Sequence, residues 1–188
     1  FSGITNVPLT GGIFIAFSIL FLFFHEIEAI VYLFFLLFVL GLVTDLKIID
    51  SPKLRFIIQS TLLFLIVYLS DLRVTPTRIY IIDLIITNVL LSYFFSTFCL
   101  LILINGSNFI DGLNGLLVGY YLLISIVFYQ LDLINFLDIG NNNLLFFSAI
   151  LFILFLLNLF EKSFMGDTGA YILSFFYGYL LIKIYSEY

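Results

Sequence analysis

Seven long stretches without a charged residue divide the chain, and short segments that carry acidic and basic side chains separate them. The stretches are Phe1–Phe24, Ala29–Thr44, Phe56–Ser70, Leu84–Ile110, Gly112–Leu131, Ile139–Phe160 and Thr168–Ile182. A helix that crosses a bilayer needs about 20 mostly apolar residues, and flanking Lys and Arg residues can extend a shorter stretch because their alkyl stems stay in the apolar layer. The pattern predicts about seven spanning helices, with a tight turn at His25–Glu28 between the first two.

Composition places the chain in the membrane class. Apolar residues make up 63% of the sequence and charged residues 10%, and the mean hydropathy is +1.25, whereas soluble domains carry about 25% charged residues. The apolar stretches are continuous and do not alternate with polar residues, which favours an all-α transmembrane bundle over a β-barrel. Residues 1–188 are expected to form one transmembrane domain with no soluble domain.

Few residues of other reactive types are present. Cys99 is the one cysteine, so the chain forms no internal disulfide, and its apolar surroundings indicate a buried small side chain. His25 is the one histidine, which argues against a zinc site. Seven basic residues spread over the sequence form no patch for nucleic acid.

Helices that cross in turn bring alternate connections to the same side of a membrane. One side then holds residues 1–10, 44–55, 105–115 and 161–170. Four Lys and Arg residues fall on this side and three on the other, so the positive-inside rule does not decide the orientation.

Three connections on that side each carry a carboxylate at the end of an apolar stretch: Asp45, Asp111 and Asp167. A Mg²⁺ ion in a phosphate-handling enzyme takes one or two carboxylates and completes its shell with water and substrate phosphate oxygens. Lys53 and Arg55 lie near Asp45 in sequence and could neutralise further phosphate charge. The side is therefore a candidate site for phosphate chemistry.

Each connection also has a plain structural interpretation. The segment "NGSNFIDGLNG" could be a solvated loop whose glycines break the helix. Asp167 or Thr168 could cap the helix that follows, and phosphate is also favoured at a helix N-terminus. Ser51 is expected to cap a helix whose first turn contains Pro52.

Taken together, these segments resemble the polyprenyl-phosphate N-acetylhexosamine-1-phosphate transferases (glycosyltransferase family 4). "NGSNFIDGLNG" is similar to the family's Asn-x-x-Asn-x-x-Asp-Gly signature, and "FMGDTGA" to its Phe-Met-Gly-Asp loop, which an asparagine such as Asn158 usually precedes. "GLVTDLKIIDSPKLRFIIQ" resembles the Asp-Asp loop with its following Ser-x-Lys-x-Arg and Gln-containing helix, and "VPLTGGI" resembles a Gly-Gly segment that enters a helix. The "SPKLR" loop is most similar to the N-acetylglucosamine branch.

The resemblance implies a role for each matching residue. It implies Asp45, Asp111 and Asp167 as catalytic residues, and Asp167 with Asn108 as ligands of Mg²⁺, with Mn²⁺ as an alternative. Substrate contacts are implied for a further set: Asn105, Asn108, Lys53, Arg55 and Asn114. Two positions depart from the pattern, since Thr44 replaces the first aspartate of the pair and Leu9 an arginine. The family's His-rich loop is absent too, and with Phe1 as first residue this predicts a fragment that lacks helices at both ends.

The implied activity is the Mg²⁺-dependent transfer of an N-acetylhexosamine 1-phosphate from a UDP-sugar to undecaprenyl phosphate, with release of UMP. This would be the first lipid-linked step of a cell-envelope polysaccharide such as O-antigen, at the cytoplasmic face of a bacterial inner membrane. A homodimer is compatible with an exposed helix face. An inactive homologue or scaffold subunit is the alternative that Thr44 and Leu9 support. A transporter is a further alternative, which the clean apolar stretches disfavour.

Overall fold

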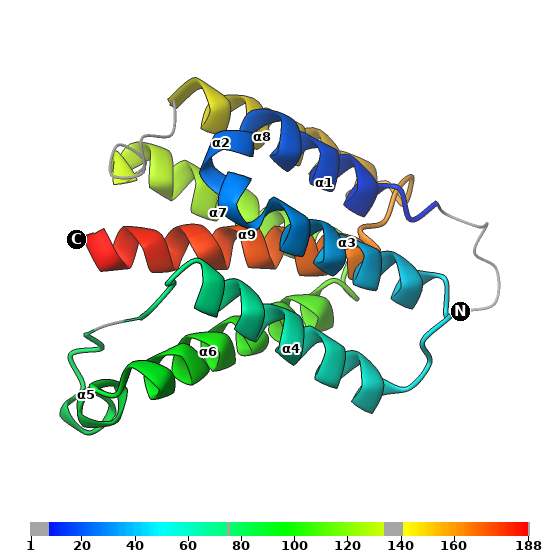
Figure 1. Ribbon diagram of the computed structural model, residues 1–188. Coiled ribbons are helices and arrows are strands. Elements are labelled where there is room, and N and C mark those ends of the chain that lie inside the picture. The colour runs from blue at the N-terminus through cyan, green and yellow to red at the C-terminus, as the bar shows by residue number, and fades with distance from the viewer. Residues whose placement is uncertain (1–7, 75, 134–140, 188) are drawn as a thin grey trace.

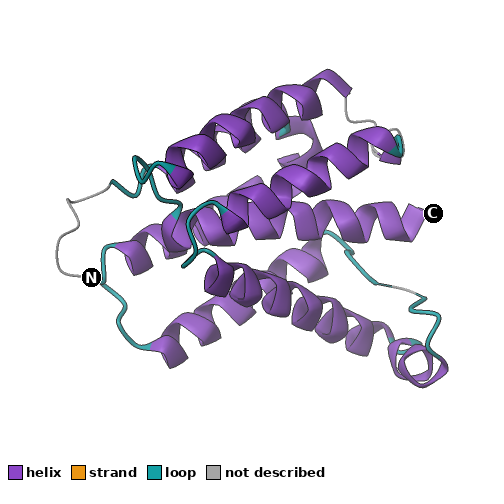
Figure 2. Ribbon diagram, turned by 180° about the vertical axis from the view of Figure 1, so that it is seen from behind, coloured by secondary structure: helices purple, strands orange, loops and turns teal. Residues whose placement is uncertain are grey.

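The structure, a computed structural model, describes residues 8–74, 76–133 and 141–187. In chain order its elements are α1 (Gly11–Leu22), α2 (Phe24–Ile27), η1 (Glu28–Ile30), α3 (Val31–Asp45), α4 (Pro52–Leu69), α5 (Tyr80–Ile86), α6 (Val89–Ile110), α7 (Leu116–Gln130), α8 (Asn141–Leu159) and α9 (Gly166–Glu187). The described ranges contain no strand, so the all-α prediction is confirmed (Figure 2). Each predicted span contains one main helix: α1, α3, α4, α6, α7, α8 or α9. The span predicted at Leu84–Ile110 is interrupted, because α5 ends at Ile86 and α6 begins at Val89.

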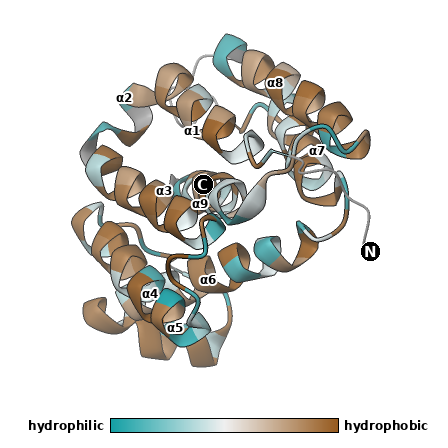
Figure 3. Cartoon of the chain, turned by 90° about the vertical axis from the view of Figure 1, so that its right-hand side faces the viewer, coloured by the Kyte–Doolittle hydropathy of each residue, from teal (hydrophilic) through white to brown (hydrophobic). Residues whose placement is uncertain are grey.

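Helix α9 is the centre of the bundle, and the other long helices surround it (Figures 1 and 3). It packs against α1, α3, α6 and α7, and every residue from Ala170 to Leu180 is buried. Small residues allow the closest approaches: a Cβ added to Gly12 of α1 would lie 2.4 Å from the backbone nitrogen of Gly169, and one added to Gly41 of α3 would lie 2.5 Å from the Cα of Thr168. Such contacts between small residues are typical of helices packed within a membrane.

The outer helices have the exposed apolar surface that lipid requires. Large side chains such as Phe17, Phe21, Tyr32 and Phe98 are exposed, and brown apolar ribbon dominates Figure 3. Three helices in the described ranges are long and apolar enough to cross a membrane on their own: Pro52–Leu69, Val89–Ile110 and Asn142–Leu159. Helices α1, α3 and α7 are apolar but shorter, with 12 to 15 residues.

The predicted alternation of connections is confirmed by contacts that join them at one end of the bundle, on the right in Figure 1. The backbone nitrogen of Phe164 donates to the Pro8 carbonyl, 3.2 Å away. At the other end of the bundle, the expected tight turn at His25–Glu28 consists of helical turns in α2 and η1. Two expectations lie partly outside the described residues: the first stretch, with the Val7 of its motif, and the connection at 132–143.

Candidate active site

The first turn of α9 is capped by a carboxylate from a different helix. Asp45, the last residue of α3, accepts hydrogen bonds through Oδ1 from the Asp167 nitrogen (2.7 Å) and through Oδ2 from the Thr168 nitrogen (3.0 Å) and hydroxyl (2.5 Å). The first N–H groups of a helix have no partner within it, and a capping side chain commonly supplies one. The sequence-based interpretation of Asp167 or Thr168 as the cap is therefore wrong, because both residues donate to the cap.

Gly166 makes this capping possible. Its φ of +66° lies in the left-handed region, and a Cβ at this position would lie 2.7 Å from Asp45 Oδ1. Only glycine combines that backbone conformation with so close a carboxylate at low energetic cost. The glycine in "FMGDTG" therefore fixes the distance between α3 and the start of α9.

Arg55 joins the third helix to this junction. Its Nη1 donates to Asp167 Oδ2 at 3.0 Å, and both side chains are partly exposed. Arg55 lies one turn into α4, where Pro52 is the first helical residue and the Ser51 hydroxyl accepts from the Leu54 nitrogen at 3.4 Å. The expected Ser51 cap is confirmed. It fixes the start of α4 and therefore the direction in which the Arg55 side chain extends from the helix.

Asp111 is the third acid at this end, and it follows directly after α6. Burial, and then the negative charges of Asp167 and Asp45, raise the pKa of the Asp111 carboxyl to about 7, while a hydrogen bond from the Gly166 backbone opposes the shift. The three acids are therefore close enough to repel one another. Asp45 accepts from the Asp167 and Thr168 amides and Asp111 from the Gly166 amide. The first three amides of α9 are therefore not free to bind phosphate, although the sequence had allowed it.

A divalent cation fits the chemistry of this donor set. In the described part of the chain, no three Asp, Glu, His or Cys side chains are arranged to hold a metal ion by themselves. Asp167 and Asp111 repel each other, and the Asn108 side chain lies within hydrogen-bonding reach of Asp167. Mg²⁺ needs only one or two protein carboxylates when phosphate oxygens and water complete its shell. Asp111, Asp167 and Asn108 are thus the residues that would hold it.

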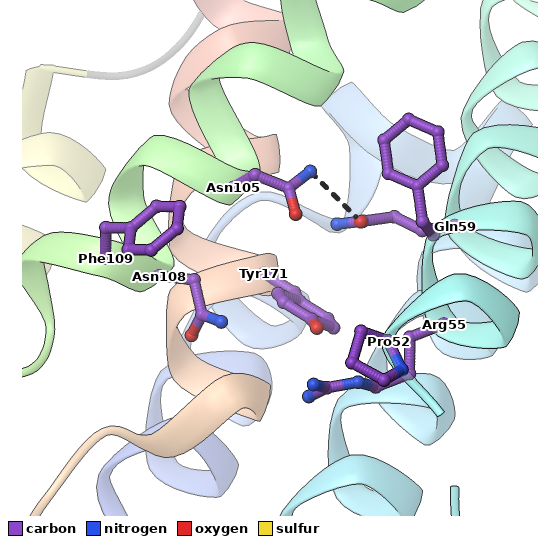
Figure 4. A pocket seen from close by; sticks show the side chains of 8 residues that line it. Pro52, Arg55, Gln59, Asn105, Asn108, Phe109 and Tyr171 are labelled. Atoms are coloured by element: carbon purple, nitrogen blue, oxygen red, sulfur yellow. Dashed lines mark hydrogen bonds between the residues drawn. The ribbon is translucent and has the colours of Figure 1, made fainter. Parts of the chain in front are cut away.

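A pocket of about 370 Å³ opens beside the acids, between α4, α6 and α9 (Figure 4). Its lining comprises Pro52, Arg55, Phe56, Gln59, Asn105, Asn108, Phe109 and Tyr171. The structure thus brings together Arg55, Asn105 and Asn108, three of the residues implied as substrate contacts. Asn105 and Asn108 belong to the last turns of α6, so the expected loop begins only at Asp111.

Other implied residues lie around this centre. Asn114 donates to Glu161 Oε1 at 3.0 Å in an exposed contact, which links the connection after α6 to the one after α8. Lys53 is exposed on the first turn of α4 and makes no polar contact with the described residues. Leu9 is exposed, whereas Thr44 is buried and its hydroxyl donates to the Leu40 carbonyl at 2.9 Å.

Two positions entered the sequence analysis only as parts of matching motifs and were given no role. Gln59, from the Gln-containing helix, lines the pocket, and a lone amide within an apolar stretch was the signal that could have identified it. Asn158 was noted only by resemblance; it is 3% exposed, and its Oδ1 accepts from the Gly115 nitrogen at the start of α7. Asn158 therefore holds the end of the segment that carries Asp111.

Comparison with known proteins identifies the family of the chain. The profile of glycosyl transferase family 4 matches residues 27–185. A phospho-N-acetylmuramoyl-pentapeptide-transferase of Dictyoglomus thermophilum is 32% identical over 179 residues, which cover 92% of this chain and 58% of that protein. The chain thus spans somewhat more than half the length of this curated relative. No solved structure matches the chain. With its three acids gathered at one end of an apolar helix bundle, the chain belongs to glycosyl transferase family 4.

Proposed function

We propose that the protein transfers an N-acetylhexosamine 1-phosphate from a UDP-sugar to undecaprenyl phosphate at the cytoplasmic face of a bacterial membrane, and that UMP leaves. The observation that carries the proposal is the convergence of Asp111, Asp167 and Arg55 beside a pocket that is open at the end of a membrane bundle. Both substrates are anionic, so this chemistry depends mainly on positioning and on neutralising charge.

In this proposal the residues have separate tasks. Asp111, Asp167 and Asn108 would hold Mg²⁺, or Mn²⁺ in its place, and the bound ion would neutralise diphosphate charge and stabilise the leaving UMP. Arg55 orients Asp167 through their 3.0 Å ion pair and directs its remaining N–H groups toward the phosphate groups. Asn105, Lys53 and Asn114 are assigned to substrate contacts, and Asp45 keeps the first turn of α9 in place.

The acceptor phosphate needs no strong base. Its second pKa is about 6, so an oxygen of undecaprenyl phosphate is largely ionised near neutral pH and can attack the β-phosphorus of the UDP-sugar directly. Thr44 offers no carboxylate at the position where the family has its first aspartate, so the chain lacks one possible base. Because the lipid phosphate is already ionised, this lack does not argue against activity. The catalytic role of Asp45 stays a prediction. In the structure both of its oxygens accept hydrogen bonds from α9, which is a capping role.

The hexosamine has two candidates. The "SPKLR" loop favours UDP-N-acetylglucosamine, which would make the product a precursor of a polysaccharide such as O-antigen. The name of the Dictyoglomus relative favours the UDP-N-acetylmuramoyl-pentapeptide, a precursor of the cell wall. The same assay separates them, because UMP is released only from the donor that is used.

The test is UMP release by the purified full-length protein with undecaprenyl phosphate, each UDP-sugar, and either Mg²⁺ or EDTA. We expect lipid- and metal-dependent UMP from one donor, and loss of turnover in Asp167→Asn but not in Asp50→Asn, which alters an exposed acid of the α3–α4 loop. Turnover by Asp167→Asn at saturating Mg²⁺ would remove Asp167 from the site. A folded protein that binds UDP-sugar without releasing UMP would instead identify an inactive homologue.

A further inference from the structure

Gln59 carries a buried donor without a partner. The side chain lies two turns into α4 and is 2% exposed. Its Oε1 accepts a hydrogen bond from Asn105 Nδ2 at 3.2 Å, but its Nε2 has no hydrogen-bond partner among the described residues. A buried donor left unpaired is unfavourable and rare in native proteins, so we expect an acceptor that is not among the described residues.

The orientation of this amide follows from its neighbour. Asn105 Nδ2 donates to the Leu101 carbonyl at 2.8 Å as well as to Gln59, which fixes the NH₂ group of Asn105 on the side of Gln59. Two NH₂ groups cannot hydrogen bond to each other, so Gln59 must present its oxygen to Asn105. Its nitrogen then points toward the middle of the pocket, as Figure 4 shows.

The pocket around this nitrogen is cationic and rich in hydrogen-bond donors, so it suits an anionic ligand. None of its eight lining residues is acidic, and Arg55 supplies a guanidinium with several N–H groups. Asn108 adds a further amide. Donors grouped around a cation are typical of sites for phosphate or carboxylate oxygens. The exposed rings of Phe56 and Phe109 border the pocket on the apolar surface of the bundle.

We propose that Gln59 is a substrate-binding residue, and that its Nε2 donates to a phosphoryl oxygen held in this pocket together with Arg55. The inference rests on the proposed function, since both substrates of that reaction carry phosphoryl oxygens. The oxygen belongs either to the lipid phosphate or to the diphosphate of the UDP-sugar. In both cases Gln59 connects the ligand to Asn105, and through it to the last turns of α6.

Gln59→Glu is the most selective variant for the test. It preserves size and the acceptor for Asn105 but replaces the donor by an oxygen that repels a phosphoryl group. Gln59→Met removes donor and acceptor without adding charge, so it stays informative where the glutamate variant does not fold. Ser60→Ala is the matched control, because Ser60 is the next residue of α4 but lines a different groove and bonds only to the Ile57 carbonyl of its own helix.

The measurement is equilibrium binding of undecaprenyl phosphate, and separately of UDP-N-acetylglucosamine and the UDP-muramoyl-pentapeptide, to the full-length protein in detergent. We expect Gln59→Glu to weaken one class of ligand by about 10- to 100-fold, as loss of a hydrogen bond to a charged group does. Weakened lipid binding would place the acceptor phosphate here, and weakened nucleotide binding the diphosphate. Ser60→Ala should bind all of them as the unaltered protein does.

Unchanged binding of every ligand by folded Gln59→Glu or Gln59→Met would overturn the inference, and would mean that Nε2 merely bonds to water. This failure is distinct from that of the proposed function. If the unaltered protein releases UMP, the proposed function stands whatever Gln59 does. If the unaltered protein binds neither class of ligand, both are overturned.

Discussion

Replacement of Asp45 by asparagine or alanine separates a capping role from a catalytic one. The Asp45 carboxylate accepts three hydrogen bonds from Asp167 and Thr168, and Thr168 is fully buried. Asparagine keeps one acceptor oxygen and the size of the side chain, whereas alanine removes both oxygens. The two variants therefore remove different parts of the cap.

The expected magnitudes follow from these contacts. Loss of an N-cap side chain costs about 0.5–2 kcal/mol, and a negative charge at a partly buried helix N-terminus contributes up to about 2 kcal/mol. Asp45 also repels Asp111, so its neutralisation offsets part of the loss. We expect Asp45→Asn to lower the free energy of unfolding by about 1–2 kcal/mol, and Asp45→Ala by about 2–4 kcal/mol because two helix N–H groups then lose their acceptor.

The assay is thermal unfolding in detergent, followed by circular dichroism, together with UMP release below the unfolding temperature. Asp50→Asn is the control, since it removes one negative charge from the same loop at an exposed position. Unfolding of both Asp45 variants at the temperature of the unaltered protein would refute the capping argument. Full stability with complete loss of turnover would establish Asp45 as a catalytic residue instead.

Three further predictions concern the neighbouring groups. Gly166→Ala should lower the free energy of unfolding by about 1–2 kcal/mol or more, because φ is +66° there and the new Cβ meets Asp45; an unchanged unfolding temperature would contradict this. Because burial raises the pKa of Asp111 to about 7 and this acid must lose its proton to bind a cation, Mg²⁺ affinity should be about tenfold higher at pH 8 than at pH 6, and Asp111→Asn should reduce that difference in Mg²⁺ titrations. Asn158→Ala leaves the buried Gly115 nitrogen unpaired and should cost about 1–3 kcal/mol in the same unfolding assay, with an effect near zero counting against the assigned bond.

The helices and the shared end of their polar connections could be predicted from the sequence because each depends on local composition. Long apolar stretches leave the backbone no alternative to helix within a membrane, and charged residues mark where such stretches end. The ends of α6 were harder to predict. Asn105 has its side-chain amide bonded to the Leu101 carbonyl one turn earlier, so a polar residue that suggested a loop is accommodated within the helix.

The geometry of the acids could not be predicted in the same way, because it depends on packing between distant segments. Asp45 and Thr168 are 123 residues apart, and no local pattern shows that one caps the helix of the other. The sequence nevertheless contains one indication of this. Met165 precedes the first residue of α9, and its side chain cannot cap a helix, so the cap must come from another segment. The role of Gln59 could not be predicted from the sequence for the same reason, since its unpaired nitrogen is evident only once the position of Asn105 is known.

The central position of α9 has a consequence for how the protein enters the membrane. Although it has 22 residues, α9 is not among the helices of the described chain that are apolar enough to cross a bilayer alone, and glycine, serine and tyrosine occupy much of its length. It also follows the other long helices in the chain, so they leave the ribosome first. We expect α9 to enter a site already prepared by its neighbours, where Gly12 and Gly41 leave room for its backbone. During biogenesis the earlier helices thus provide the surface that surrounds α9 in place of lipid.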